Sequence, residues 1–392
     1  MTNDDTTRTD LNEVEKALAA SLNRRDFLKS AGLIFGGLAI SPALLAACTS
    51  DSGNKSSAQS IHISNWTSYI GESQKKDFEK ATGIKLTYTE DVNDNSEYFA
   101  KIQPQLNRNK SINRDGFILT DWMANRIINQ VKWAQPLSTK KFPNKKNLVD
   151  TLASPSFDET RKYSVPWASI IAGIAYNIKL TGKEIKTFDD FLNVSGSKTV
   201  LSEMRDTIGI MLMDSGVKIE SADFSSTEKE FDRLQELLDS KKIDGVNGND
   251  YVTDLSSGNL AACFAWSGDV AQIARDNPDV RFVIPESGGT ISSDNFMIPI
   301  SSDKPDLATE FINYFYDPAV SAQWVSEVQY ISPVQGITEE LTKLGGDAAK
   351  LVDDPLVVPD EDVLKQLQIF AALSEKDEEE FDKRSADIVG AG

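Results

Sequence analysis

The chain has 392 residues, of which 40% are hydrophobic and 26% are charged, and its formal net charge at pH 7 is −19. This composition is typical of a folded globular protein, and the length suggests two domains, each large enough for its own core. The negative charge disfavours nucleic acid and anionic lipid as partners and favours cationic ligands, although an acidic surface also serves solubility alone.

Cysteine and histidine are too scarce for several kinds of chemistry. The sequence contains two cysteines, Cys48 and Cys263, and a single histidine, His62. They do not make a disulfide framework, and a Cys/His metal site is not expected. A histidine general base would have to be His62. We therefore expect neither a metal nor another cofactor.

Residues 1–47 have the features of an export signal. The segment 23–29, Asn-Arg-Arg-Asp-Phe-Leu-Lys, resembles the twin-arginine motif, and an apolar run over 31–47 follows it. The run ends in Leu-Ala-Ala before Cys48, which resembles a bacterial lipobox and implies cleavage before Cys48 and lipidation of this cysteine. A transmembrane helix is the alternative, and Pro42 argues against it. Residues 48–59 are then a flexible linker to a membrane lipid anchor.

From residue 60 onward, short apolar segments alternate with amphipathic ones. The first half predicts strands at 61–63, 84–88 and 116–119 and helices at 72–82, 96–106 and 122–133, with Gly83 ending the first helix. The second half predicts strands at 163–167, 174–176, 199–202, 260–266 and 280–284, and helices at 306–316, 319–328 and 362–384. This alternation favours an α/β fold with a mainly parallel sheet, and no internal repeat is visible.

A series of short segments resembles one family in both order and spacing. It opens with Asn-Trp-Thr-Ser-Tyr at 65–69, directly after the first strand, and continues with Phe-Glu-Lys-Ala-Thr-Gly-Ile-Lys at 78–85. Further matching segments lie at 115–122, 163–166, 264–268 and 285–289, at Asp294 and Pro299, and at 330–333. Over residues 60–335 the chain resembles the spermidine/putrescine (polyamine)-binding lipoproteins of bacterial ABC importers, in extracellular solute-binding protein family 1.

The resemblance implies a two-lobed periplasmic-binding-protein-like clamshell of type II, with two α/β domains joined by a hinge. Lobe 1 takes residues 60–170 and 294–340, and lobe 2 takes 171–293 and 341–392. From the resemblance we expect a monomer on the extracytoplasmic face of the membrane that captures a polyamine by closing its lobes. We expect it then to deliver the polyamine to the permease of an ABC transporter.

The family's ligand-binding positions carry residues suited to an extended cation. Carboxylates hold ammonium groups, while aromatic faces bury methylenes at ~0.8 kcal/mol each and attract cations by ~2 kcal/mol where both are desolvated. The residues at these positions are Trp66, Tyr69, Thr120, Trp122, Glu203, Asp206, Trp266, Asp294 and Tyr330. A polar contact from Gln366 or Gln368 is a further option.

Several of these residues have a purely structural alternative. Trp66 could be a core aromatic that ends a strand, and Trp122 could be the first apolar residue of its helix. Glu203 and Asp206, three residues apart, share a helical face but could simply complement the helix dipole. Arg205, which lies between them in sequence, could neutralise one of the two acids.

One position departs from the family pattern. The family often has a second tryptophan two residues before the acid that corresponds to Asp294, and this chain has Ser292 there. One aromatic wall is therefore missing or comes from elsewhere. The identity of the polyamine stays open, and a modified amine is an alternative.

Two other functions compete with polyamine binding. The first is another solute in the same fold, although an anion would favour arginines or helix N-termini in the cleft. The second is an exported hydrolase, because Ser-Asp-Asn at 293–295 occurs in penicillin-binding enzymes. The Lys-Thr-Gly of those enzymes, the Gly-x-Ser-x-Gly elbow and the P-loop pattern are missing from the sequence. We therefore expect a binding protein and not an enzyme.

Overall fold

The computed structural model describes residues 59–391. The predicted export signal, Cys48 and almost all of the predicted linker lie outside the described residues. None of the helices within 59–391 combines the length and the apolar composition needed to cross a bilayer.

The centre of the fold is a mixed sheet in the order β2-β1-β3-β10-β5-β8-β6-β7, with the short strands β4, β9 and β11 pairing to its two long strands. The strands are β1 Ser60–Trp66, β2 Lys85–Val92, β3 Gly116–Thr120, β4 Ala134–Gln135, β5 Ser164–Asn177, β6 Lys198–Leu201, β7 Gly245–Asn247, β8 Ala262–Trp266, β9 Val280–Val283, β10 Gly289–Pro299 and β11 Leu367–Gln368.

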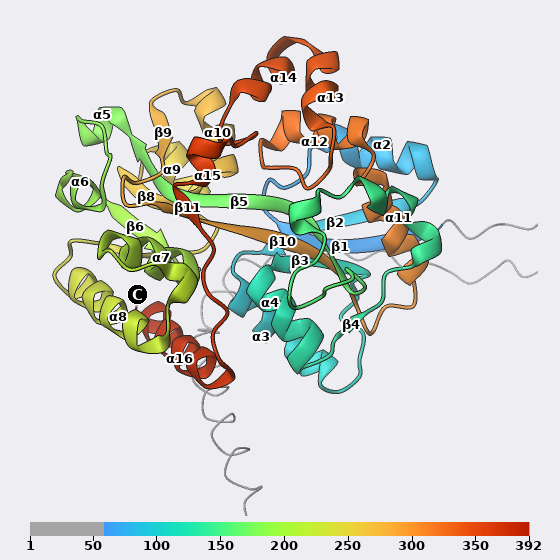
Figure 1. The fold of residues 1–392 in the computed structure, drawn as a ribbon, viewed down its shortest axis with the longest axis horizontal. Helices are drawn as coiled ribbons and strands as arrows, with labels where there is room; N and C mark the ends of the chain where they lie inside the picture. The colour runs from blue at the N-terminus through green and yellow to red at the C-terminus, as the bar shows by residue number, and fades with distance from the viewer. Residues whose placement is uncertain (1–58, 392) are drawn as a thin grey trace, which may run out of the picture. The chain divides into compact units, whose positions relative to one another are not determined.

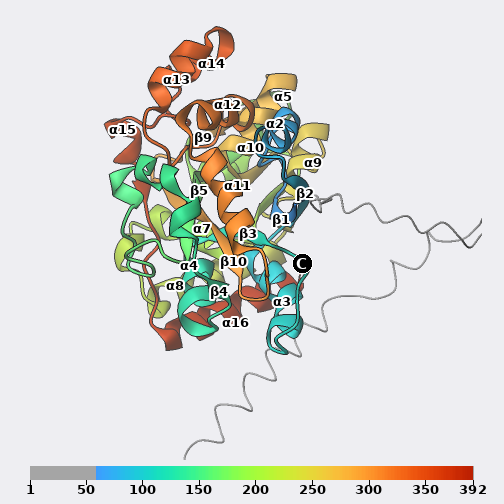
Figure 2. The ribbon, with the colours of Figure 1, turned by 90° about the vertical axis from the view of Figure 1, so that its right-hand side faces the viewer.

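Helices pack on both faces of this sheet (Figures 1 and 2). The α-helices are α2 Glu72–Thr82, α3 Asn95–Leu106, α4 Asp121–Asn125, α5 Ile178–Thr181, α6 Phe188–Asn193, α7 Met204–Asp214, α8 Phe224–Asp239, α9 Tyr251–Ser257, α10 Ser267–Asp276, α11 Pro305–Phe315, α12 Pro318–Val328, α13 Ile337–Leu344, α14 Gly346–Lys350, α15 Glu361–Leu364 and α16 Glu375–Ala391. The π-helix η1 spans Arg126–Gln130, and the 3₁₀ turns are η2 Thr139–Lys141, η3 Pro143–Asn147, η4 Asp150–Leu152, η5 Ile219–Ser221 and η6 Leu351–Asp353.

The two long antiparallel strands β5 and β10 connect two groups of shorter strands. The C-terminal half of β10 pairs with β3, where Asp294 lies opposite Thr120. β3 in turn pairs with β1, and β1 pairs with β2. The C-terminal half of β5 pairs with β8. β8 in turn pairs with β6, and β6 pairs with β7. Figure 1 shows β5 and β10 running between the two groups. The result is a two-lobed α/β fold in which the parallel strands of each group lie on opposite sides of the β5–β10 pair.

The structure corrects three sequence predictions. The strands predicted at 163–167 and 174–176 are one strand, β5, because all of its residues are buried and the central ones pair with β10. The sheet is mixed and not mainly parallel, since β5 and β10 run antiparallel to their neighbours. The helix predicted at 362–384 is interrupted, because residues 367–368 pair with β10 as strand β11.

Local sequence signals explain several helix ends. Asp94 caps α3, since its carboxylate accepts hydrogen bonds from the backbone N–H groups of Ser96 and Glu97. Gly83 ends α2 with φ 74°, which confirms the predicted left-handed residue. The helix predicted at 122–133 begins as α4 but widens into the π-helix η1 and ends at Gln130. The first of these caps positions the loop between β2 and α3, which borders the candidate site.

Candidate ligand-binding site

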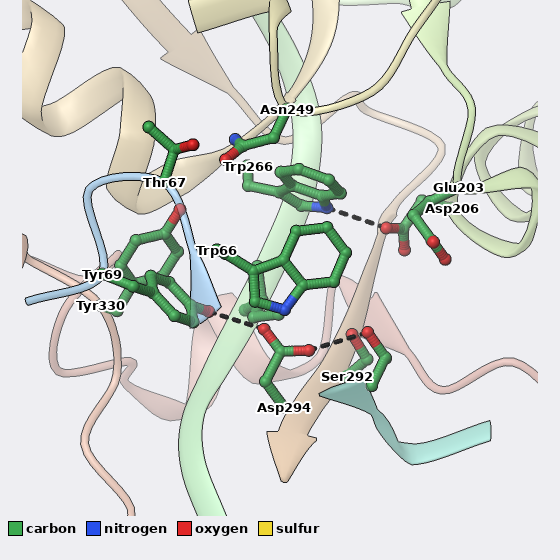
Figure 3. Close-up of a pocket in the computed structure, with 12 residues that line it drawn as sticks. Trp66, Thr67, Tyr69, Glu203, Asp206, Asn249, Trp266, Ser292, Asp294 and Tyr330 are labelled. Atoms are coloured by element: carbon green, nitrogen blue, oxygen red, sulfur yellow. Dashed lines mark hydrogen bonds between the residues drawn. The ribbon is translucent and has the colours of Figure 1, made fainter. Parts of the chain in front are cut away.

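A pocket lies where strands of both groups end against the β5–β10 pair, with about 330 Å³ of space not filled by atoms, open solvent included (Figure 3). It is lined by Trp66, Thr67, Tyr69, Thr120, Ile170, Glu203, Asp206, Asn249, Trp266, Ser292, Asp294 and Tyr330. Trp66, Thr120 and Trp266 are the last residues of β1, β3 and β8. Ligand sites in open α/β sheets form at such carboxyl ends of strands. Apart from Trp122, every predicted ligand residue of the described range lines this pocket.

Asp294 lines the pocket with 1% of its surface exposed. Its carboxylate accepts hydrogen bonds from the Tyr69 hydroxyl at 2.9 Å and from Thr120 Oγ1 at 2.7 Å. Burial raises the pKa of Asp294 to about 7, and the two hydrogen bonds act in the opposite direction. An ionised Asp294 therefore lacks a positive partner, which an ammonium group of a ligand would supply.

Glu203 is the residue directly before α7, and its carboxylate is tied to the opposite strand group. Its Oε1 accepts hydrogen bonds from the backbone N–H and the side-chain amide of Asn95, both at 2.9 Å. Asn95 also donates to Thr120 Oγ1 at 2.9 Å, so one chain of hydrogen bonds runs from Glu203 to Asp294. Burial and the nearby Asp94 carboxylate raise the pKa of Glu203 well above its usual value.

Asp206, in the first turn of α7, is the third carboxylate of the pocket. It accepts hydrogen bonds from the indole Nε1 of Trp266 at 2.9 Å and from the Thr290 hydroxyl. Burial raises the pKa of Asp206, and these two bonds lower it. The bond to Trp266 also fixes the orientation of an indole ring that faces the pocket (Figure 3).

Aromatic rings form the sides of the pocket. Trp66 and Trp266, from different strand groups, meet edge to face with centroids 5.6 Å apart. Tyr69 and Tyr330 make a similar contact at 4.5 Å. The indole Nε1 of Trp66 is buried without a hydrogen-bond partner. Trp66 is thus buried, as expected of a core aromatic, and also lines the pocket.

One buried carboxylate that bonds to lining residues was not predicted from the sequence. Asp269, in α10, accepts hydrogen bonds from the hydroxyls of Tyr330 and Tyr251, at 2.6 and 2.8 Å, and from Asn249 Nδ2 at 2.7 Å. Burial raises the pKa of Asp269 to about 6. Its position three residues after Trp266, in the first turn of the helix that follows β8, was an available signal.

Trp122 lies outside the pocket lining. Its ring lies against the Arg205 guanidinium, with the Arg205 Cζ atom 3.9 Å from the ring centroid. The two glutamines proposed as further contacts also bond elsewhere. The Gln366 side chain donates to the Asp362 carbonyl, and the Gln368 side chain accepts from the Ile219 N–H. Neither glutamine is among the lining residues.

Ser292 lines the pocket on β10, and its strand partner Ile170 on β5 lines it as well. At this position the pocket wall is therefore a hydroxyl beside an aliphatic side chain. None of the lining residues, all of which are described, is basic. The pocket thus combines Glu203, Asp206 and Asp294 with aromatic sides, an arrangement suited to a cation and unsuited to an anion.

A two-lobed α/β fold with a pocket between two strand groups defines a substrate-binding protein of the periplasmic type. The family model described as bacterial extracellular solute-binding protein matches residues 73–355, and the chain belongs to this family.

Curated relatives agree with this assignment, and a solved structure shows the same fold. The chain is 27% identical over 363 residues to the putrescine-binding periplasmic protein PotF of Escherichia coli, covering 86% of this chain and 90% of that protein. It is 26% identical to the putrescine-binding periplasmic protein SpuD of Pseudomonas aeruginosa, covering 81% and 88%. A spermidine/putrescine ABC transporter structure from Listeria monocytogenes matches with a TM-score of 0.72 at 23% identity, covering 84% of this chain and 98% of that one. These relatives are named for binding and transport and not for catalysis.

Proposed function

We propose that this protein captures a polyamine such as putrescine or spermidine outside the cytoplasm and delivers it to the membrane permease of an ABC importer. The observation that carries the proposal is the set of three carboxylates, Glu203, Asp206 and Asp294, which share one aromatic pocket with no basic residue in its lining. Putrescine-binding relatives support the same substrate class.

The ligand chemistry follows from the two kinds of side chain. A polyamine carries ammonium groups along a methylene chain, and each carboxylate offers an acceptor to one ammonium group. Trp66 and Trp266, whose rings contact each other, offer the methylenes an apolar surface, and burial there contributes ~0.8 kcal/mol for each CH₂. Their faces also attract the ammonium groups, by ~2 kcal/mol where both partners are desolvated. An ammonium group beside Asp294 relieves the cost of burying that charge.

Lobe closure is the proposed step that completes the site. We assign residues 60–170 and 294–340 to lobe 1 and 171–293 and 341–392 to lobe 2, with the hinge in β5 and β10. Contacts across the pocket support a closed form: Ser202 Oγ donates to Asp94 Oδ2 at 2.6 Å, and the Asn249 N–H donates to the Asn93 carbonyl at 3.1 Å. The ligand drives closure because it contacts both lobes only in that form.

A ligand panel tests the substrate class. The protein without its leader is titrated in a calorimeter with putrescine, cadaverine, spermidine and spermine, and with γ-aminobutyrate, glutamate and glucose as comparison solutes. We expect saturable binding of at least one polyamine and none of glutamate or glucose. Tight binding of an anion or a sugar, with no response to any polyamine, contradicts the proposal.

Ser292 supports a second candidate within the same class. A serine side chain is far smaller than a tryptophan, and Ser292 lines the pocket beside Ile170. We propose that this difference in size accommodates a substituent on one amine, such as an acetyl group. N-acetylputrescine added to the panel distinguishes the two candidates, since a preference for it over putrescine selects the modified amine.

The lipid anchor is a further part of the proposal and rests on the lipobox at Cys48. We propose a monomer held at the extracytoplasmic membrane surface through the lipidated cysteine. Replacement of Cys48 by Ser is expected to move the protein from the membrane fraction to the soluble extracytoplasmic fraction. Membrane retention of this variant contradicts the anchor and leaves the ligand proposal intact.

A further inference from the structure

Arg205 occupies an unexpected place for a residue between two acids of a cation site. It lies between Glu203 and Asp206 in the sequence, and yet its guanidinium is directed away from the pocket lining. Its Nη2 donates to Glu378 Oε1 at 3.2 Å. The guanidinium also contacts two rings, with Cζ 3.9 Å from the centroid of Trp122 and 5.0 Å from that of Phe381.

The partners of Arg205 form a small charge cluster, which we name the Arg205 cluster: Arg126, Arg205, Glu378 and Asp382. Glu378 Oε1 also accepts a hydrogen bond from Arg126 Nη2 at 3.3 Å, and Asp382 pairs with Arg126. The cluster therefore holds two positive and two negative side chains. Arg205 and Glu378 are only 11% and 10% exposed, so their charges are poorly screened by water.

The acids of this cluster come from the C-terminal helix α16. That helix packs against α8, beside α7, as Figure 1 shows. Phe381 of α16 meets Phe231 of α8 edge to face, with centroids 5.0 Å apart. Glu378 is thereby held at the end of α7 that bears the pocket acids. Its second oxygen accepts from Gln130 Nε2 at 3.2 Å, so both carboxylate oxygens are engaged.

We infer that α16 determines the charge specificity of the pocket, because Glu378 holds the Arg205 guanidinium away from Glu203 and Asp206. This inference rests on the proposed function. Arg205 already interacts electrostatically with Glu203, so a guanidinium released from Glu378 has a pocket acid nearby with which to pair. Arginine–carboxylate pairs are strong where they are desolvated, so this pair would compete directly with an ammonium group of the ligand. Sequestration of Arg205 keeps the pocket negative.

Three variants test the inference by calorimetric titration with putrescine and spermidine. Glu378→Gln is expected to weaken binding by about tenfold or more, because the released Arg205 guanidinium would compete with the ammonium group for a pocket acid. Arg205→Gln is expected to leave the affinity unchanged or to increase it. The double variant, which lacks the released guanidinium, is expected to bind within about threefold of the unmodified protein. Glu379→Gln is the matched control, because Glu379 is the exposed neighbour on the same helix.

The outcomes separate this inference from a purely structural role of the cluster. Unchanged affinity in Glu378→Gln overturns it, and so does a double variant that binds as weakly as Glu378→Gln alone. If Glu378→Gln does not fold, weakened binding in Arg205→Gln overturns it. Retained binding in Arg205→Gln and in the double variant then supports it. If the unmodified protein binds amines and all variants bind them equally well, this inference alone is contradicted. If the unmodified protein binds no amine, the proposed function is contradicted as well.

Discussion

The side-chain amide of Asn95 donates to the Glu203 carboxylate at 2.9 Å, and these two residues belong to opposite strand groups. Asn95 follows β2 at the start of α3, and Glu203 follows β6 at the start of α7. Because the Asn95 backbone N–H donates to the same oxygen, the Asn95 bonds leave Glu203 Oε2 available for a ligand. This pair therefore joins the halves of the pocket while it positions an acid in it.

Asn95→Ala is expected to weaken polyamine binding by about tenfold. The change leaves the buried Glu203 oxygen and the Thr120 groups short of partners, which costs ~1–3 kcal/mol. The loss is expected mainly in the dissociation rate, measured by stopped-flow release of ligand. Asn107→Ala, at the exposed C-terminal end of the same helix, is the control. Equal dissociation rates in both variants would count against the role of Asn95.

Asp294→Asn is expected to weaken polyamine binding by at least about tenfold, because an amide removes a buried charge partner of the ammonium group. The same change is expected to stabilise the ligand-free protein at about pH 8, where the buried carboxylate is ionised at a cost. Calorimetric affinity and thermal unfolding measure the two effects. Asp303→Asn, an exposed acid on the loop after β10, should change neither. An unchanged affinity in Asp294→Asn would exclude Asp294 from the site.

Polyamine affinity is expected to fall as the pH falls below about 7. The pKa of Asp294 in the ligand-free protein is raised to about 7 by burial, whereas alkylammonium groups, with a pKa near about 10, stay charged throughout this range. Binding of the cation therefore requires release of a proton at lower pH. Titrations near pH 6.5 in buffers of different ionisation enthalpy measure this release. A pH-independent affinity between about pH 5.5 and 8 would contradict the assignment.

The ligand-free protein is expected to gain stability as the pH falls from about 8 to about 5. Asp294 and Asp269 have folded-state pKa values raised to about 7 and about 6, above the unfolded value near about 3.9. The folded state therefore binds more protons in this window, and the stabilisation is lost as the pH rises through those values. The midpoint of urea unfolding measures the effect. Asp294→Asn should reduce this pH dependence, and an unaltered slope would contradict the raised pKa.

Gly248→Ala is expected to weaken ligand binding without any change to a lining residue. A Cβ atom at Gly248 would lie 2.4 Å from Asn93 Nδ2 and 2.8 Å from the Asn93 carbonyl oxygen, so the proposed closed form would be strained. Gly245→Ala, at the start of the strand β7 that precedes Gly248, is the matched control, because nothing lies within 4 Å of its Cβ position. Calorimetry and small-angle scattering with ligand measure affinity and closure. Full closure of Gly248→Ala would contradict the interpretation of this contact.

The sequence determined the local chemistry of this protein. The sequence placed Trp66 and Trp266 next to predicted strands, and the family resemblance selected them, together with Thr120 and Asp294, as ligand positions. Such signals are local, because they depend on the alternation of apolar and polar residues, on helix caps and on neighbouring residues. They can therefore be recognised without knowledge of the tertiary contacts. The helix end at Gly83 was predictable for the same reason.

The tertiary structure alone decided which distant residues share an environment. Asp269 bonds to Tyr330 because α10 packs beside the segment after α12. Trp122 lies outside the pocket lining with its ring against Arg205, whose guanidinium also contacts Phe381 of α16. The direction of Arg205 could not be read from its neighbours Glu203 and Asp206. A buried charge pairs with whichever opposite charge the packing brings near, and for Arg205 that charge, Glu378, lies 173 residues away in the chain.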